Sequence, residues 1–251
     1  MSLTSTPFPM YDLPELADAH DLFWRRFVAL AQRGDFANDI PLTQICGYPL
    51  ATSLRNRFDV IAVPVYDVPF SKGATHCGLV VVGADTSYTA LEDLRGARFA
   101  LNAWDSNTGM NLPRRLVAPL AERGRFFSDV IETGSHFASL AAVQRGAADV
   151  ASIDNVTFAL LAEHRPAAVE GVRVLTPTAS SPTLPFVTPA SKKRITAFLY
   201  DSLAATIDQL RRLGLCTALH LTGVERASVA RYDQLLLLEN EATDLGYGTL
   251  A

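Results

Sequence analysis

Apolar residues recur with a helical spacing in some stretches of the chain and form short continuous runs in others. The helical spacing is clearest between Ser135, a good N-cap residue, and Gly146, a residue well suited to end a helix. It also predicts helices over 16–32, 155–163 and 192–212. Among the continuous runs, Gly78 to Gly83 is typical of a strand buried on both faces.

Shorter apolar runs predict further strands between these helices. They cover residues 42–45, 60–66, 98–102, 130–131, 149–153 and 172–175, with another strand over 2–10. Residues 176–189 are rich in Pro, Ser and Thr and predict an extended connection, and the tail over 224–239 predicts a helix. Because strands alternate with helices, we expect an α/β fold whose sheets are mixed but mostly parallel.

The order of the elements predicts two lobes. The segment from Leu94 to Leu175 has the pattern of a self-contained βαβ unit, between a strand near Val81 and the Pro-rich segment near Pro185. The chain would pass from one lobe to the other at each of these two places. We therefore expect a discontinuous lobe of residues 1–82 plus 178–251, an inserted lobe of residues 83–177, and two hinge strands joining them.

Composition narrows the class of protein. The chain has 251 residues, of which 49% are hydrophobic, and its net charge of −4 provides no basic footprint for nucleic acid. No run reaches the roughly 20 apolar residues that a membrane-spanning helix needs. Met1 to Pro9 lacks the basic and apolar regions of a signal peptide, which leaves two expectations open: a cytoplasmic protein, or the mature start of a periplasmic one.

Cys46, Cys77 and Cys216 are too widely spaced for a zinc site and too few for a disulfide framework. The familiar catalytic motifs G-x-S-x-G, H-E-x-x-H, the P-loop and G-x-G-x-x-G do not occur. We therefore expect no enzyme activity, and the pattern calls for neither a cofactor nor a metal ion.

Polar turns follow several of the predicted strands. In open α/β sheets, ligands bind beyond the carboxyl ends of the strands, so we expect the polar residues of these turns to line one cleft. These candidate ligand-binding residues are Tyr11, Tyr48, Ser106, Asn107, Thr108, Gly109, Ser135, His136 and Asp154.

The turn from Ser106 to Gly109 combines hydroxyl groups with backbone N–H groups at the start of a helix. That chemistry suits the acceptor oxygens of phosphate, phosphonate or sulfate, and Gly109 lets the backbone approach closely. An ordinary helix cap is the alternative. Pro113 lacks an N–H, so either the regular helix begins after Gly109 or its first turn is loose.

His136 lies at a predicted helix N-terminus, where the helix dipole disfavours a charged imidazole and a bound anion would reverse that preference. It either contacts a ligand or completes the cap. Asp154 either accepts a hydrogen bond from a ligand ammonium group or caps the following helix. Tyr11 and Tyr48 either wall the cleft or pack in the core.

At these positions the chain resembles the phosphonate/phosphate-binding family of ABC importer solute receptors, which have the type II periplasmic-binding-protein fold. The most specific match runs from Gly134-Ser135-His136-Phe137-Ala138-Ser139-Leu140 to Asp149-Val150-Ala151-Ser152-Ile153-Asp154. Further matches are Pro9–Asp12, Gln44–Leu50, Asp105–Gly109 and Leu184–Thr188.

The resemblance implies a role for seven of these nine candidates. Ser106, Asn107, Thr108 and His136 would hold the anionic head group, Tyr11 and Tyr48 would flank the ligand, and Asp154 would contact the rest of it. It implies capture of a small anionic solute (a phosphonate, phosphate or phosphate ester) by hinge closure, and delivery to an ABC permease. Two alternatives remain at this point: an enzyme of a cofactor-biosynthesis pathway on the same fold, and a cytoplasmic ligand sensor.

Overall fold

The chain folds into two compact units in a computed structural model that describes residues 8–32, 40–215 and 217–251. Unit 1 comprises Met1–Thr75 and Pro182–Tyr232, and unit 2 comprises His76–Ser181 and Asp233–Ala251. The chain therefore passes between the units three times. At two of these crossings the short strands β3 (Thr75–His76) and β9 (Ser181–Pro182) pair with each other. Most of the strand expected over 2–10 lies outside the described residues.

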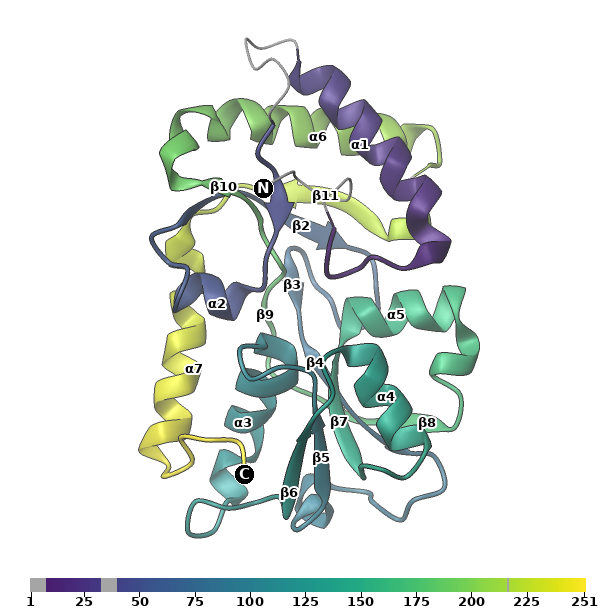
Figure 1. The fold of residues 1–251 in the computed structure, drawn as a ribbon, viewed down its shortest axis with the longest axis vertical. Helices are drawn as coiled ribbons and strands as arrows, with labels where there is room; N and C mark the ends of the chain where they lie inside the picture. The colour runs from purple at the N-terminus through teal and green to yellow at the C-terminus, as the bar shows by residue number, and fades with distance from the viewer. Residues whose placement is uncertain (1–7, 33–39, 216) are drawn as a thin grey trace. The chain divides into compact units, whose positions relative to one another are not determined.

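Unit 1 is built on a four-stranded sheet in the order β1-β10-β2-β11, in which every neighbouring pair is antiparallel. Its strands are β1 (Thr43–Gln44), β2 (Phe58–Tyr66), β10 (Phe186–Pro189) and β11 (Leu221–Glu225). Its helices are α1 (Ala17–Ala31), α2 (Gly47–Ala51) and α6 (Thr196–Arg212). The helices expected over 16–32 and 192–212 are confirmed, and Figure 1 shows α1 and α6 on the same side of this sheet.

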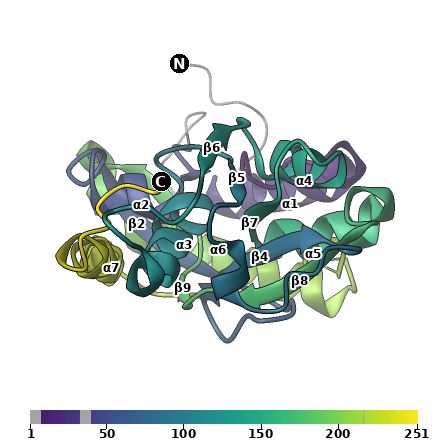
Figure 2. The same cartoon turned by 90° about the horizontal axis from the view of Figure 1, so that it is seen from below.

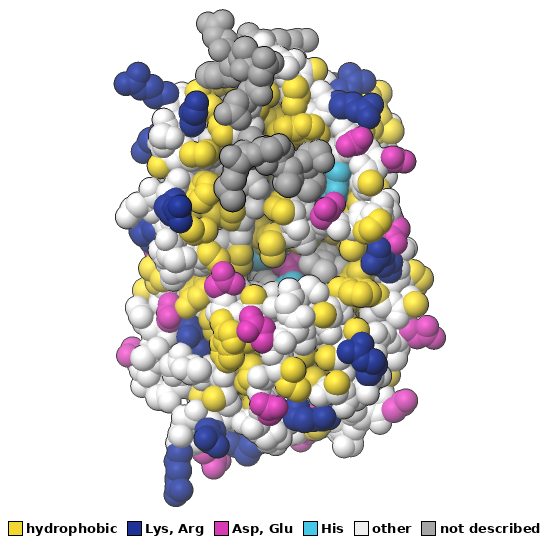
Figure 3. All heavy atoms as spheres, in the orientation of Figure 1, with side chains coloured by type: hydrophobic (Ala, Val, Ile, Leu, Met, Phe, Trp, Pro, Cys, Tyr) yellow, Lys and Arg dark blue, Asp and Glu magenta, His cyan; other side chains and the backbone are white. Residues whose placement is uncertain are grey.

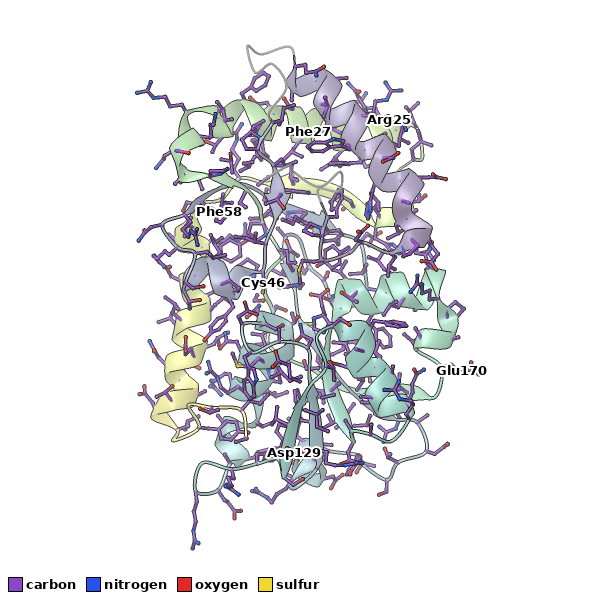
Figure 4. All side chains as sticks on the ribbon, in the orientation of Figure 1. Arg25, Phe27, Cys46, Phe58, Asp129 and Glu170 are labelled. Carbon is purple, nitrogen blue, oxygen red and sulfur yellow. The ribbon has the colours of Figure 1, made fainter. Side chains whose placement is uncertain are left out.

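The pattern of α1 explains how it packs. Phe23 and Phe27 are completely buried, whereas the Arg25 side chain is 79% exposed and pairs with Asp21 one turn away. Arg25 and Phe27, labelled in Figure 4, thus lie on opposite faces of one helix. An apolar stripe of this kind is what drives a surface helix onto a sheet.

Unit 2 is built on a five-stranded sheet in the order β6-β5-β7-β4-β8, which can be followed from strand to strand in Figure 2. The strands are β4 (Gly78–Gly83), β5 (Arg98–Leu101), β6 (Asp129–Glu132), β7 (Val150–Asp154) and β8 (Val172–Pro177). The helices are α3 (Leu112–Val117), α4 (His136–Gln144), α5 (Asn155–His164) and α7 (Asp233–Asp244). The expected buried strand over Gly78 to Gly83 is confirmed.

The α/β class with mixed sheets is confirmed, but the expected excess of parallel pairs is corrected. In the five-stranded sheet of unit 2, the parallel pairs are β5 with β6 and β5 with β7. Strand β4 runs antiparallel to both β7 and β8. A continuous apolar run shows that a strand is central and buried, but burial is the same for either direction of the chain.

The last segment of the chain belongs to unit 2, which differs from the expected assignment of 178–251 to one lobe. Arg114, only 4% exposed, donates from Nη1 to the carbonyl of Gly248 at 2.8 Å. Arg115 Nε donates to Glu241 Oε2 at 2.5 Å, and α7 lies beside α3 in Figure 1. These contacts join residues more than a hundred positions apart, which local spacing does not reveal. Part of the helix expected over 224–239 is instead the end of β11, and α7 begins at Asp233.

The surface carries charges of both signs. On the face drawn in Figure 3, basic and acidic side chains are interspersed over the described residues. Across 8–32, 40–215 and 217–251, none of the helices combines the length and apolar character needed to cross a bilayer.

Candidate functional site

Seven of the nine candidate residues lie in unit 2, on segments that follow three neighbouring strands. Ser106 to Gly109 follow β5, Ser135 and His136 follow β6, and Asp154 ends β7. Because β6 and β7 both run parallel to β5, the carboxyl ends of the three strands meet at one edge of the sheet. The polar turns are thus gathered within a single unit.

The segment after β5 is a π-helical turn over Asn107–Asn111, which answers the question raised by Pro113. Ser106 Oγ accepts a hydrogen bond from the backbone N–H of Gly109 at 3.0 Å, so the cap that was the alternative for Ser106 is present. The N–H of Asn111 bonds the carbonyl of Ser106 at 3.0 Å, five residues back. Regular α-helix then begins at Leu112, which places Pro113 in its first turn, where proline is tolerated.

The π-helical turn leaves the carbonyl of Thr108 without a backbone donor from the helix. The N–H of Leu112 bonds Asn107, and the next residue, Pro113, has no N–H to give. Ser152, from the middle of β7, donates its hydroxyl to the Thr108 carbonyl at 2.6 Å instead. One buried serine therefore ties the turn to the central strand of the sheet.

Two glycines permit this close packing. A Cβ on Gly109 would lie 1.7 Å from Asn102 Oδ1, and a Cβ on Gly78 would lie 2.6 Å from the Thr108 carbonyl oxygen. Both distances are far below van der Waals contact, so the backbone can approach only because these residues have no side chain. Asn102 Oδ1 is itself buried and has no hydrogen-bond partner among the described residues.

His136 is the first residue of α4. Ser135 Oγ accepts from the N–H of Ala138 at 3.1 Å, which confirms Ser135 as the N-cap, and Gly146 ends the helix with φ of 67°. His136 is 8% exposed, and its ring atom Nε2 lies 3.2 Å from Thr108 Oγ1. Its Nδ1 is buried without a hydrogen-bond partner.

The charge state of His136 follows from this burial. Burial lowers its pKa below the ordinary value of 6.5, because the charged imidazolium loses hydration. The nearby Asp154 carboxylate and the backbone carbonyl of Ser152 oppose this effect, and His76 adds to it. Near neutral pH the ligand-free ring is therefore the uncharged form.

Asp154 has both carboxylate oxygens engaged. Oδ1 accepts from the N–H of Thr157 at 2.9 Å, which confirms the capping role, and Oδ2 lies 2.6 Å from His76 Nδ1. Both side chains are buried. Burial alone would raise the pKa of Asp154, but the charge and hydrogen bond of His76 bring it below its ordinary value. Burial, with the Asp154 charge adding to it, raises the pKa of Cys77 to about 12.

Sequence reasoning missed three side chains of this cluster. His76 is a lone histidine ahead of a buried strand, and nothing in its spacing singles it out. Asn102 follows β5 and shows no pattern of its own. Ser152 does carry a signal, since it is a polar residue inside the apolar strand β7 and must find a hydrogen-bond partner there.

Tyr11 and Tyr48 belong to unit 1 and are both buried. The ring of Tyr11 packs edge-on against Tyr66 at 5.5 Å between centroids, and Gln44 donates to the Tyr66 hydroxyl at 3.2 Å. Tyr48 lies in α2, a short helix after Cys46 where the sequence predicted only a turn (Figure 4). A ligand role for either tyrosine stays a prediction.

Two hollows are lined by residues of a single unit. One in unit 2, of about 200 Å³, is bordered by Leu112, Arg115, Leu116, Ala179 and Leu238. The other, in unit 1 and of about 360 Å³, is bordered by Arg55, Asn56, Phe58, Asp59, Ala190, Lys193 and Val229. Neither contains a candidate residue from the sequence.

The fold is that of solute-binding proteins with two lobes. Solved structures of this class are similar to the chain at low identity, which shows the fold alone. A binding protein component of an ABC phosphonate transporter from Pseudomonas aeruginosa shares 14% identity at a TM-score of 0.69, over 96% of this chain and 87% of that one.

Two further structures have the same fold. PhnD1 from Prochlorococcus marinus, in complex with methylphosphonate, gives a TM-score of 0.64 at 14% identity, over 91% of this chain and 89% of that one. The periplasmic aliphatic sulphonate binding protein SsuA from Escherichia coli gives 0.56 at 15% identity, over 92% and 87%. No curated protein matched the sequence.

The chain belongs to the family described as ABC transporter, phosphonate, periplasmic substrate-binding protein, which it matches over residues 37–232. The family consists of substrate-binding proteins and not of enzymes, in agreement with the expectation from the sequence. Membership implies a small solute as ligand and a permease as partner.

Proposed function

We propose that the protein binds a small tetrahedral anion of the phosphonate or phosphate type and delivers it to an ABC permease. The carrying observation is the pair formed by Thr108 and His136, in which one imidazole nitrogen meets a hydroxyl and the other is buried without a partner. A buried polar atom left unpaired costs about 1–3 kcal/mol, and a bound acceptor oxygen at Nδ1 would remove that cost.

The surroundings of the pair favour negative charge. His136 opens α4, whose first backbone N–H groups point out of the helix end, and only that of Ala138 is taken by the Ser135 cap. Ser106 Oγ keeps a hydroxyl proton that can be donated, and Thr108 Oγ1 keeps one when His136 Nε2 is the donor of their hydrogen bond. Donors from two turns at one sheet edge suit an anion with three or more acceptor oxygens.

The relatives support this class of ligand. One structure of the same fold holds methylphosphonate, and another belongs to an aliphatic sulphonate binding protein. Both ligands are tetrahedral oxyanions on an alkyl group. For this chain, we propose that Asp154 does not contact the ligand but holds His76 in place, because both oxygens of Asp154 already have hydrogen-bond partners.

Isothermal titration calorimetry with methylphosphonate, inorganic phosphate and methanesulfonate tests the proposal. His136→Asn should weaken binding by about 1–3 kcal/mol, or about 5- to 150-fold in dissociation constant, because it removes the proposed donor. His164→Asn, at the end of α5 in the same unit, is the matched control and should bind as the unchanged protein does. Absence of binding for all three anions, or equal affinity in the His136 variant, would contradict the proposal.

A further inference from the structure

Two hydrogen-bonded pairs of buried side chains lie near each other in unit 2. The negative charge of Asp154 acts on the histidines of both pairs. His76 pairs with Asp154 at 2.6 Å, and His136 meets Thr108 at 3.2 Å. The pairs are close enough for the charges of Asp154 and His76 to act on His136. All four side chains are buried, so a change of charge in one is poorly screened by water.

The elements around His136 contribute few other charges. Apart from His136 itself, α4 and the π-helical turn carry only uncharged side chains, and β7 contributes Asp154 alone. The short strand β3 contributes His76. Strands β5 and β8 also pack against α4 and carry Arg98, which pairs with Asp149, and Arg173, which donates to the carbonyl of Thr86. Asp154 is held by His76 and by the Thr157 N–H, so its charge is balanced within the unit rather than by a ligand. No carboxylate of this cluster is left to pair with a ligand cation.

A bound anion changes the preferred state of His136. In its neutral form the ring donates from only one nitrogen. If Nδ1 donates to a bound anion, Nε2 must accept the Thr108 hydroxyl, which is then not available to the ligand. The imidazolium donates from both nitrogens at once. It then bonds Thr108 with Nε2 and the anion with Nδ1, and it frees the Thr108 hydroxyl to donate to the same anion.

We propose that unit 2 binds its anion together with one proton, which His136 holds, while His76 and Asp154 balance each other as a fixed pair. This inference rests on the proposed function, because it assigns the proton to the same anion site. It makes His76 a positioning residue, which acts on the site through Asp154 without touching the ligand.

The sign of the pH dependence follows. The free ring has a pKa below 6.5, and the anion raises the pKa of the bound ring. Between these two values, binding takes up a proton, so affinity falls as pH rises, by up to about tenfold per pH unit. Above the pKa of the bound ring no proton is taken up and the affinity stops changing.

Calorimetry in buffers of different ionisation enthalpy measures the proton directly. The unchanged protein is titrated with methanesulfonate and with methylphosphonate near pH 7, in PIPES, MOPS and imidazole buffers. The slope of the observed enthalpy against buffer ionisation enthalpy is the number of protons taken up. Methanesulfonate stays a monoanion throughout, so a proton taken up with it belongs to the protein.

We expect a slope approaching one proton for the unchanged protein and near zero for His136→Gln, which retains weaker binding. His76→Gln keeps a donor for Asp154 but removes the imidazole whose charge lowers the pKa of His136, so it should move the pH at which affinity declines to a higher value. Binding with a slope near zero in the unchanged protein, or a slope retained in His136→Gln, overturns the inference and leaves the proposed function intact. Absence of binding for both anions overturns both.

Discussion

The hydroxyl of Ser152 donates to the Thr108 carbonyl in place of the backbone N–H that Pro113 lacks. A double-mutant cycle tests this directly. Ser152 is 1% exposed and donates to the Thr108 carbonyl at 2.6 Å. In Ser152→Ala the carbonyl stays buried without a partner. The expected loss is about 2 kcal/mol in the free energy of unfolding, within the range of about 1–3 kcal/mol for a buried orphaned acceptor.

The second half of the test restores the missing donor. Pro113→Ala supplies an N–H five residues after Thr108, in step with the π-helical bonds before it. Alone, this change should cost about 0.4–1 kcal/mol, because the unfolded chain gains freedom when proline is removed. In the Ser152→Ala background the new N–H bonds the orphaned carbonyl. The double variant should then be about 1 kcal/mol more stable than the sum of the single effects predicts.

Urea denaturation followed by circular dichroism measures all four members of the cycle. Ser202→Ala is a matched control, because Ser202 is also a buried serine, 6% exposed, and lies in α6 of the other unit. It should lose clearly less stability than Ser152→Ala. If the changes in unfolding free energy caused by Ser152→Ala and Pro113→Ala add within about 0.3 kcal/mol, the Ser152 hydroxyl does not take the place of the missing N–H.

Two further predictions concern unit 2. Arg98 holds the pKa of Asp149 below its ordinary value of 3.8 through hydrogen bonds of 2.8 and 3.0 Å, so the pair stabilises the fold above that pH and loses its effect as pH falls through the lowered pKa. Asp149→Asn should therefore lower the urea midpoint more at pH 6 than at pH 3, and an equal gap at both values would contradict this. Gly109→Ala should cost about 1–3 kcal/mol by overpacking against Asn102, and much less in an Asn102→Ala background; equal costs in the two backgrounds would show that the clash lies elsewhere.

Much of the local structure was predictable because its causes are local. The boundaries of α4 follow from Ser135 and Gly146, which act within one turn of the helix they cap. The gathering of Ser106 to Gly109 with His136 and Asp154 follows from strand ends at one sheet edge. The direction of β4 and the return of α7 to unit 2 were not predictable, because both depend on pairings between distant segments.

Within the candidate site, the sequence predicted which residues gather better than it predicted what each one does. His136 and Thr108 were predicted as neighbours of one anion, and the structure brings them within hydrogen-bond distance. Asp154 was predicted as either a cap or a ligand contact, and the partner that decides its role is His76, which lies 78 positions earlier. A contact between residues so far apart produces no pattern in the spacing of residues along the sequence.

The final residues of the chain have a consequence for the order in which the protein is made. The carbonyl of Ala251 accepts hydrogen bonds from the N–H groups of Phe126 and Phe127, at 2.7 and 3.0 Å. A ribosome produces residues 76–181 long before residues 233–251, and at about 5–20 residues per second the delay is several seconds. During that interval the surface that later receives α7 and the terminal segment is uncovered, so unit 2 reaches its full set of contacts only after unit 1 has been synthesised completely.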